Sequence, residues 1–441
     1  MKFQTILLIF FGLMAVVGVI AFSQPSSDKK DSPIGDASGN VAIWGTFPLN
    51  VELTTLIAEF NKTYKDSFSI SYQFHDPKTF DNEIVEALAS GIGPDILLLP
   101  DDLIIRHSDK IAIIPYTSVP QSVFTTNFIQ AAEVYMRPDG VVALPFAIDP
   151  MVLYWNRDIF NNSSVTLPPK YWDEFLSLTP KLTRRDNKTQ ELTQSTIALG
   201  EYVNVNHAKD VLALLFLQVG NPILSYENGK PIVKLAVQSG GGTFVPKQDI
   251  VSAFRFFMDF SNPTKSIYTW SRAKNNSQNE FINGNLAMHL DFSSSHKIIE
   301  LKNPHLNFGV AGTPQPRGTS AEVTFAKVYG LSVLKSSKNQ KTAFIAITKL
   351  LTDEKPAQQF ADAFDLPPVR RDLLARKPTD AALSVFYDAA IRARTWLDPK
   401  PEISDRSFQS MVESVSSGRE NVSSAISKLQ TDLEAALRLS I

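Results

Sequence analysis

Aromatic and hydrogen-bonding side chains occur in segments predicted to be loops, and they are the residues best suited to a chemical task. Tryptophan and tyrosine rings can stack on the flat C–H faces of sugars, while carboxylates and hydroxyls can pair with sugar hydroxyls. The aromatic candidates are Trp44, Trp155, Trp270, Tyr154 and Tyr329, and the polar candidates are Asp101, Asp149, Asp291, Ser293 and Ser294. Any of the rings could instead lie in a core. Trp44 and Trp270 are the better candidates because each precedes a polar loop.

Catalytic motifs are missing from the sequence. It has no G-x-S-x-G elbow, no H-E-x-x-H helix and no phosphate-binding loop, since Gly240–Gly242 lacks a lysine partner. It also has no cysteine, which excludes disulfides, cysteine nucleophiles and thiol-linked lipid anchors. His289 and His296 lie in a segment without a predicted helix to align them as metal ligands. We therefore expect no catalytic residue, metal or cofactor, although a carboxylate pair such as Asp149 with Asp291 leaves glycosidase chemistry open.

Length and charge limit the class of protein. At 441 residues the chain is long enough for two or three domains. Its formal net charge of −2 argues against a nucleic-acid partner, because such proteins usually carry a basic excess or a basic face.

The N-terminal segment predicts export. Thr5–Phe22 is an uncharged apolar run after Lys2, at the short end of what spans a bilayer. Ala21 and Ser23 are spaced for signal-peptide cleavage before Gln24. We expect residues 1–22 to be a membrane anchor or a cleaved signal peptide, and the polar residues 23–40 to be a flexible tether. The rest of the chain would then lie on the outer face of the cytoplasmic membrane, or be secreted or periplasmic if cleavage occurs.

The residues that follow alternate between strand and helix patterns. Predicted strands cover 41–44, 68–74 and 95–100, and predicted helices cover 49–64 and 76–91. This order predicts a mostly parallel sheet, whose ligands bind at the carboxyl ends of strands. Those ends are Gly45–Pro48 and Pro100–Asp102. Later segments predict an extended stretch at 141–156 and helices at 171–178, 208–219, 249–260 and 422–440.

Seven motifs in order resemble the bacterial extracellular solute-binding proteins of the maltose-binding-protein class. They span nearly all of 41–441, and they are VAIWGTF, ALASGIGPDILLLP, ALPFAIDPMVLYWNRDIF, LPPKYWDEFL, FINGNLAMHL, VAGTPQPRG with YGLSVLKSSKNQKTAF, and the Pro367–Asp372 stretch. The sequence departs from this family in lacking the lipid-anchor cysteine, and in having Tyr171 where threonine is usual.

The resemblance implies a two-lobed α/β periplasmic-binding-protein-like fold of type II, with hinge strands and a ligand cleft between the lobes. Lobe 1 would take 41–148 plus 292–335, and lobe 2 would take 149–291 plus 336–441. The implied ligand-binding residues are Trp44, Thr46, Asp101, Asp149, Trp270, Asp291, Ser293 and Tyr329.

The implied function is capture of a small ligand, most often a mono- or oligosaccharide, for the membrane subunits of an ABC transporter. We expect a monomer. A ligand sensor that docks onto a membrane receptor is an alternative that differs in its partner. An enzyme acting on carbohydrate on the same scaffold is the second alternative.

Overall fold

The computed structural model describes residues 37–227, 229–239, 244–319 and 321–439, which form two compact units. Unit 1 takes the chain up to Ile148 and then Lys327–Arg376, and unit 2 takes Asp149–Ala326 and residues from Lys377 onward. The segment 1–22, predicted as an anchor or signal peptide, lies outside the described residues. Within them, no helix combines the length and the apolar character needed to cross a membrane.

Unit 1 is built on a mostly parallel sheet, as predicted. Its strand order is β2 (Phe68–Phe74), β1 (Gly39–Gly45), β3 (Ile96–Pro100) and β16 (Thr324–Val333). β1 runs parallel to both β2 and β3, while β16 runs antiparallel to β3. Leu97–Leu99 are fully buried. They form a continuous apolar run because a strand that is covered on both faces has no solvent-facing side. β1 begins two residues before the predicted strand, inside the predicted tether.

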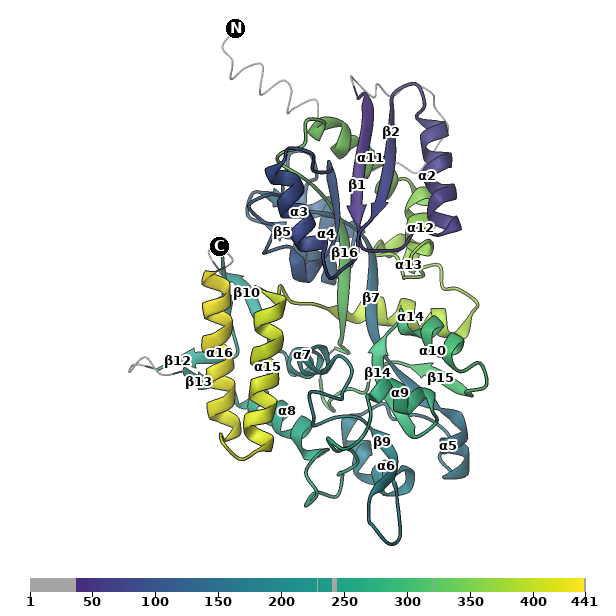
Figure 1. Cartoon of the computed structure of the whole chain (residues 1–441), viewed down its shortest axis with the longest axis vertical. Coiled ribbons are helices and arrows are strands. Elements are labelled where there is room, and N and C mark those ends of the chain that lie inside the picture. The colour runs from purple at the N-terminus through teal and green to yellow at the C-terminus, as the bar shows by residue number, and fades with distance from the viewer. Residues whose placement is uncertain (1–36, 228, 240–243, 320, 440–441) are drawn as a thin grey trace. The chain divides into compact units, whose positions relative to one another are not determined.

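Helices cover this sheet (Figure 1). α2 (Val51–Thr63) begins at the cap residue Asn50, whose Oδ1 accepts from Leu53 N at 2.8 Å, and it packs on β2. α3 (Phe80–Ala89) begins four residues after the predicted cap Asp76, whose Oδ1 accepts from Lys78 N in a turn instead. α11 (Gln340–Thr352) contacts β1, and α12 (Glu354–Asp362) contacts α2. The other elements are η1 (Asp101–Leu103), β4 (Ile114–Pro115), α4 (Gln121–Asn127), η2 (Gln130–Tyr135), β5 (Met136–Arg137), β6 (Gly140–Val141) and α13 (Arg371–Leu374).

Unit 2 has a mixed sheet. β14 (Leu286–Phe292) lies between β7 (Leu144–Asn156), to which it is antiparallel, and β9 (Leu192–Ile197), to which it is parallel. β15 (Phe308–Ala311) also pairs with β7. Further strands and helices of unit 2 are α5 (Arg157–Asn162), η3 (Trp172–Glu174), α6 (Phe175–Leu182), β8 (Arg184–Arg185), α9 (Ser277–Ile282), α10 (Ser295–Lys302), α14 (Ala381–Arg392) and β17 (Ala393–Arg394).

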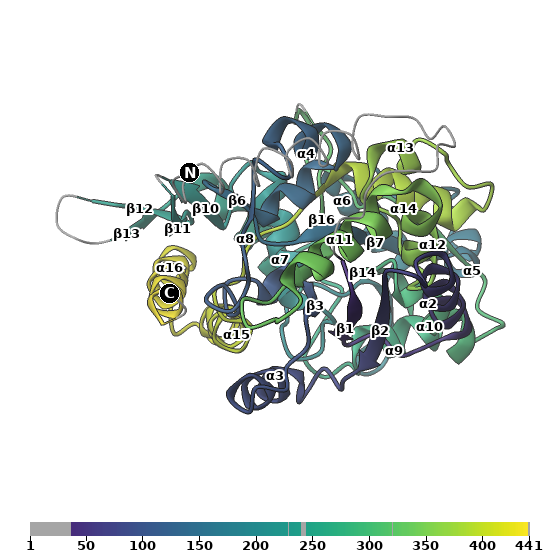
Figure 2. The same ribbon diagram turned by 90° about the horizontal axis from the view of Figure 1, so that it is seen from above.

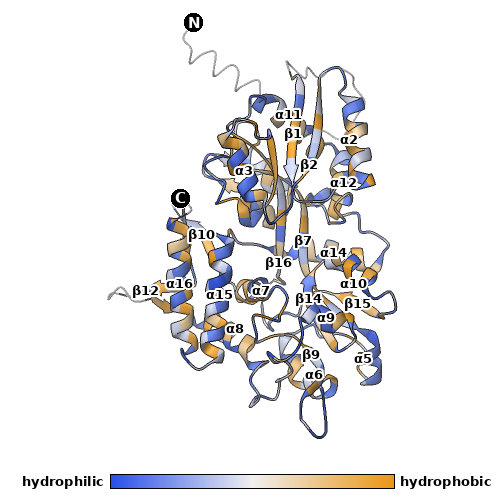
Figure 3. Ribbon diagram, in the orientation of Figure 1, coloured by the Kyte–Doolittle hydropathy of each residue, from blue (hydrophilic) through white to orange (hydrophobic). Residues whose placement is uncertain are grey.

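The longer helices of unit 2 confirm the periodicity of the sequence. α7 (Ala208–Gln218) and α8 (Gln248–Asp259) lie where helices were predicted. α15 (Pro401–Ser416) and α16 (Val422–Arg438) lie side by side (Figure 1). α16 buries an apolar stripe within its own unit and exposes polar residues between, as the alternating colours of Figure 3 indicate. The buried stripe includes Ile426, Leu429, Leu433 and Leu437.

Two β-hairpins lie beside α16. They pair β10 (Leu224–Glu227) with β11 (Lys230–Val233), and β12 (Ala236–Gln238) with β13 (Phe244–Pro246). The strands of the second hairpin lie next to α16 in Figure 2, and Ser427 Oγ of α16 donates to Phe244 O at 2.9 Å. Gln430 on α16 anchors the start of this hairpin, since its Oε1 accepts from Leu235 N and Ala236 N at 3.0 and 3.1 Å.

The unit boundaries differ from the predicted lobes after the first one. Residues 292–326 were assigned to lobe 1 but lie in unit 2, because β15 pairs with β7 there. Residues 336–376 were assigned to lobe 2 but lie in unit 1, because α11 and α12 pack on β1 and α2. The chain changes unit after Ile148 inside β7, after Ala326 inside β16, and after Arg376.

Candidate functional site

The carboxyl ends of β1, β2 and β3 define one edge of the unit 1 sheet, here called the unit 1 edge. Parallel pairing places Gly45 opposite Phe74, and the antiparallel strand β16 places Tyr329 opposite Pro100. The loops that follow β1 and β3 therefore lie close to Tyr329, which is more than two hundred positions later in the sequence. This is where a sheet of this type presents its ligand-binding loops.

A corner of two partly exposed aromatic rings lies at the unit 1 edge. The rings of Phe47 and Tyr329 are 4.9 Å apart between centroids and nearly perpendicular, at 70°. Behind them, Phe364 lies 4.5 Å from Phe47, and Phe146 lies 5.2 Å from Phe364. The two outer rings thus rest on buried aromatic residues, which fixes their positions.

Tyr72 holds the loop that carries Phe47. Its hydroxyl donates to Phe47 O at 2.8 Å and accepts from Phe47 N at 3.1 Å. Burial raises the pKa of Tyr72, and its bond to Phe47 only partly offsets this, so the hydroxyl keeps the proton that it donates. Gly45 makes room for the hydroxyl, because a Cβ there would lie 2.7 Å from Tyr72 Oη and 3.0 Å from Leu98 Cβ.

Of the residues predicted at the first strand, Trp44 and Thr46 are half-buried. The Trp44 ring lies 4.1 Å from the imidazole of His75, at 35°, so one of its faces is covered. His75 Nδ1 contacts the Glu83 carboxylate, and its Nε2 is buried without a partner among the described residues.

Asp101 and Asp102 follow β3 and have different environments. Asp101, a predicted ligand acceptor, is 1% exposed, and its Oδ1 accepts from Val328 N at 3.2 Å, which joins the end of β3 to β16. Asp102 is the more exposed of the two, and its Oδ2 lies 3.5 Å from Lys327 Nζ. Asp102 and Lys327 therefore form a partly exposed ion pair at the unit 1 edge. Asp102 lies in the predicted segment Pro100–Asp102, whereas Lys327 was not predicted there.

Asp291, another predicted acceptor, is a fully buried carboxylate at the end of β14. Its Oδ1 accepts from Phe292 N at 2.8 Å and lies 3.2 Å from His207 Nε2. Its Oδ2 accepts from Asn206 Nδ2 at 3.1 Å and Gln278 Nε2 at 3.0 Å, and lies 2.9 Å from a second histidine, His289. Burial raises its pKa, but the bonds from the two histidines outweigh burial and hold the pKa well below its usual range.

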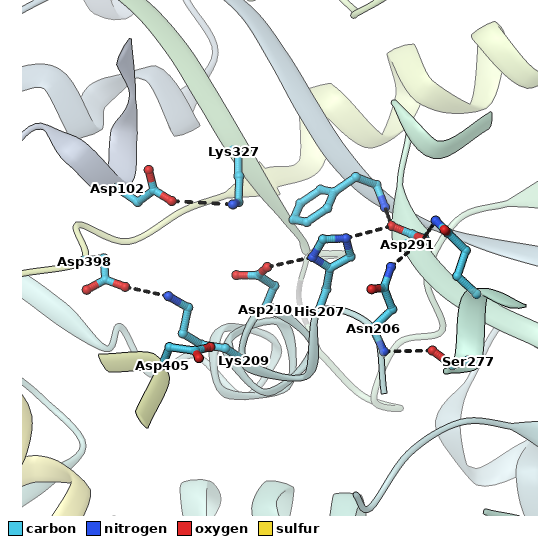
Figure 4. A network of polar contacts seen from close by, with 12 residues as sticks. Asp102, Asn206, His207, Lys209, Asp210, Ser277, Asp291, Lys327, Asp398 and Asp405 are labelled. Atoms are coloured by element: carbon cyan, nitrogen blue, oxygen red, sulfur yellow. Dashed lines mark hydrogen bonds and ion pairs between the residues drawn. The ribbon is translucent and has the colours of Figure 1, made fainter. Parts of the chain in front are cut away.

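His207 precedes α7 and lies between two carboxylates (Figure 4). Its Nδ1 is 3.5 Å from Asp210 Oδ2 and its Nε2 is 3.2 Å from Asp291 Oδ1. Burial lowers its pKa, but the bonds to Asp210 and Asp291 outweigh this and raise the pKa to about 9. The imidazole is therefore a cation at neutral pH, with a third of its side chain exposed. Its backbone is left-handed, at φ 55°.

Asp149 and Ser293 are brought together, as their prediction in one site requires. The Asp149 Oδ1 accepts from Ser293 Oγ at 2.7 Å and Ser294 N at 3.0 Å. Burial raises the pKa of Asp149, and the bonds from these serines only partly oppose it. We call the group formed by Asp149, Ser293, His207 and Asp291 the unit 2 polar cluster.

A second ion pair joins Lys209 on α7 to Asp398, which lies in the segment before α15. Lys209 Nζ lies 2.8 Å from Asp398 Oδ2 (Figure 4). It also lies 3.3 Å from Ser404 Oγ, which is on α15. Within the described ranges, no group of three or more His, Cys, Asp or Glu side chains is arranged to hold a metal ion.

Trp270 was predicted to present its ring to a ligand from beside a polar loop, but it is buried. Its indole is 0% exposed and packs in a core with Tyr154, Phe281 and Leu286. The Nε1–H donates to Asn204 Oδ1 at 3.1 Å. The polar residues after Trp270 concealed this, because a tryptophan can enter a core wherever its N–H finds an acceptor.

Comparison with known proteins identifies the fold. Residues 55–384 match the family of bacterial extracellular solute-binding proteins. Among curated proteins, none matches this chain. Similar solved structures include the cyclic α-maltosyl-1,6-maltose-binding protein of Arthrobacter globiformis, at 15% identity and a TM-score of 0.73, over 91% of this chain and 100% of that chain.

Two further solved structures have the same two-lobed architecture. A cyclo/maltodextrin-binding protein complexed with maltotetraose has 15% identity and a TM-score of 0.71, over 92% of this chain and 98% of that chain. An ABC transporter solute-binding protein of Thermotoga lettingae, bound with α-D-tagatose, has 18% identity and a TM-score of 0.66, over 91% of this chain and 100% of that chain.

Proposed function

The chain belongs to the bacterial extracellular solute-binding proteins, and on that premise we propose that it captures a carbohydrate and delivers it to the membrane subunits of an ABC importer. The similar structures support the choice of ligand, because they are described with maltotetraose, with tagatose and as a cyclic maltosyl-maltose-binding protein.

The observation that carries the proposal is the aromatic corner of Phe47 and Tyr329 at the unit 1 edge. Two partly exposed rings at 70° offer apolar surface in two orientations, which suits the C–H faces of a sugar ring. The neighbouring Asp102–Lys327 pair offers a carboxylate and an ammonium group for its hydroxyls. Thr46 and Trp44 stay proposed ligand residues of this edge, and Phe47 joins them.

The charges at both candidate regions favour a neutral ligand. Lys327 is paired with Asp102, Lys209 with Asp398, and His207 with two carboxylates. An anionic ligand would have to compete with a carboxylate for each of these cations. A neutral polyol can hydrogen-bond to such groups without separating them.

In unit 2 we propose Asp149 and Ser293 as ligand-binding residues, and His207 as a third. We propose binding without chemical conversion. A glycosidase needs a free carboxylate as nucleophile or base, whereas Asp291 already contacts five donor or histidine groups.

We propose a monomer held at the outer face of the membrane by residues 5–22, or released by cleavage before Gln24. Mass spectrometry of the N-terminal peptide from intact cells decides between these two forms. A mature protein that starts at Gln24 contradicts the anchor.

A thermal-shift experiment tests the function. Maltotetraose and α-D-tagatose are compared with glutamate and spermidine, since a ligand that binds only the folded state raises the melting temperature. We expect stabilisation by a sugar, and we expect Phe47→Ala to abolish most of it. Leu301→Ala, which alters an 80% exposed residue of unit 2, is the control and should respond to sugar as the wild type does. Stabilisation by glutamate or spermidine but by neither sugar contradicts the proposal.

A further inference from the structure

We infer that Tyr72 is a positioning residue for the proposed sugar site, acting through the peptide of Phe47 rather than by touching the ligand. This inference rests on the proposed function, because it assigns Phe47 a ligand-facing ring. It concerns the Tyr72 hydroxyl, which bonds to both polar backbone atoms of Phe47, its N–H and its C=O.

Tyr72 is held by a regular strand of the unit 1 sheet. Tyr72 lies inside β2, opposite Ile43 of the parallel strand β1. Its hydroxyl reaches beyond the end of β1 to the next loop, where it donates at 2.8 Å and accepts at 3.1 Å. The two hydrogen bonds hold the peptide units on either side of the Phe47 Cα, and so they fix the place and the direction of the backbone at this residue, which a single bond would leave free to pivot.

Gly45 makes room for the Tyr72 hydroxyl. A side chain at residue 45 would lie within 2.7 Å of the tyrosine oxygen, so only glycine allows the hydroxyl to approach. The Phe47 ring then has defined neighbours on two sides, with the ring centroids of Tyr329 at 4.9 Å and of Phe364 at 4.5 Å. Removing the hydroxyl leaves the rings of Phe47 and Tyr329 unchanged. It removes the two hydrogen bonds that hold the loop of Phe47, and this loop sets the angle between the rings.

A preorganised ring binds more tightly because the ligand does not have to order it. Tyr72→Phe removes the hydroxyl and keeps the aromatic ring. We expect its Kd for maltotetraose, or for tagatose if that is the sugar bound, to rise about threefold to tenfold, the range of one or two lost hydrogen bonds. Tyr116→Phe is the matched control, since its hydroxyl donates to Arg137 O at 2.7 Å beside the separate β4–β6–β5 sheet. It should leave Kd unchanged.

A double-mutant cycle separates positioning from general stability. In a Phe47→Ala background, Tyr72→Phe should change Kd less than about twofold, because the ring it positions is gone. An equal rise in Kd in both backgrounds overturns the inference. So does an unchanged Kd for Tyr72→Phe when Phe47→Ala weakens binding.

Hydrogen exchange gives a readout that needs no ligand. The Phe47 amide should exchange at least about tenfold faster in Tyr72→Phe than in the wild type, while the Ile43 amide keeps its rate. Equal rates at Phe47 overturn the inference. If the exchange rates differ as expected and neither sugar binds the wild type, the proposed function fails and the anchoring of the loop stands.

Discussion

His207 Nε2 lies 3.2 Å from Asp291 Oδ1, and this contact joins the start of α7 to the end of β14 in unit 2. Because Asp210 faces the other ring nitrogen, the imidazole is bridged by carboxylates on both sides. The contact therefore depends on the protonation of His207.

The first prediction is a loss of stability at alkaline pH. The folded-state pKa of His207 is raised from 6.5 to about 9, so its contribution is fully present below pH 6.5 and is lost as pH rises through about 9. We expect the difference in unfolding free energy between wild type and His207→Gln to shrink by about 1–2 kcal/mol, after allowance for solvent screening. Urea unfolding across this pH range measures it. His305→Gln, at an exposed position, is the control, and a constant difference would contradict the bridge.

The second prediction concerns Trp270. Trp270→Ala should lower the free energy of unfolding by about 3–5 kcal/mol, because it opens a cavity in a closed core. Urea unfolding without ligand measures this loss. Trp270→Phe should lose less unfolding free energy, because the phenyl ring fills part of the space. It still loses some, because Asn204 Oδ1 no longer accepts the indole N–H. A loss below about 1 kcal/mol for the alanine variant would show that the indole lies outside the core.

The third prediction is for Trp44, whose ring is covered on one face by His75. If the other face meets the ligand, Trp44→Ala should weaken sugar binding by about 1–3 kcal/mol and leave the fold intact. Isothermal titration gives the affinity, and melting without ligand gives the stability. A large fall in the melting temperature of Trp44→Ala without ligand would show that Trp44 is a core residue.

The fourth prediction concerns Gly45. Gly45→Ala places a Cβ against Tyr72 and Leu98, so the unfolding free energy should fall by about 1–3 kcal/mol. Gly312→Ala is the matched control, because no atom lies within 4 Å of the Cβ it would add. Thermal melting compares the two variants. Equal melting temperatures would mean that the loop after β1 moves aside at little cost.

The strands and helices were predictable because the apolar spacing of each is local. Leu97–Leu99 are continuous in sequence and fully buried, and the stripe of α16 repeats at helical spacing. The parallel sheet of unit 1 followed from the alternation of these segments. The assignment of residues after 291 to the lobes was less accurate, because it depends on which earlier strand or helix each segment joins.

The candidate site was only partly predictable. Asp149 and Ser293, which the resemblance implied for one site, are joined by a hydrogen bond, and Tyr329 lies opposite Pro100 at the unit 1 edge, while their binding of a ligand stays a prediction. His207 gave no signal, because its partners come from a helix turn and from a distant strand. Phe47 lies three residues after the predicted Trp44 in the motif VAIWGTF. The spacing of the two aromatic residues in the sequence does not show that the Trp44 ring packs on His75 while the Phe47 ring packs on Tyr329.

The pairing of β3 with β16 has a consequence for synthesis on the ribosome. Leu97 pairs with Ser332, so β3 emerges long before its neighbour has been translated. At 5–20 residues per second this delay is on the order of 10 s or more. During that time one side of β3 is an open edge of buried-type leucines, which is a site for aggregation. Secretion systems and chaperones that hold the nascent chain unfolded would therefore protect this protein more than a protein in which paired strands are close together in sequence.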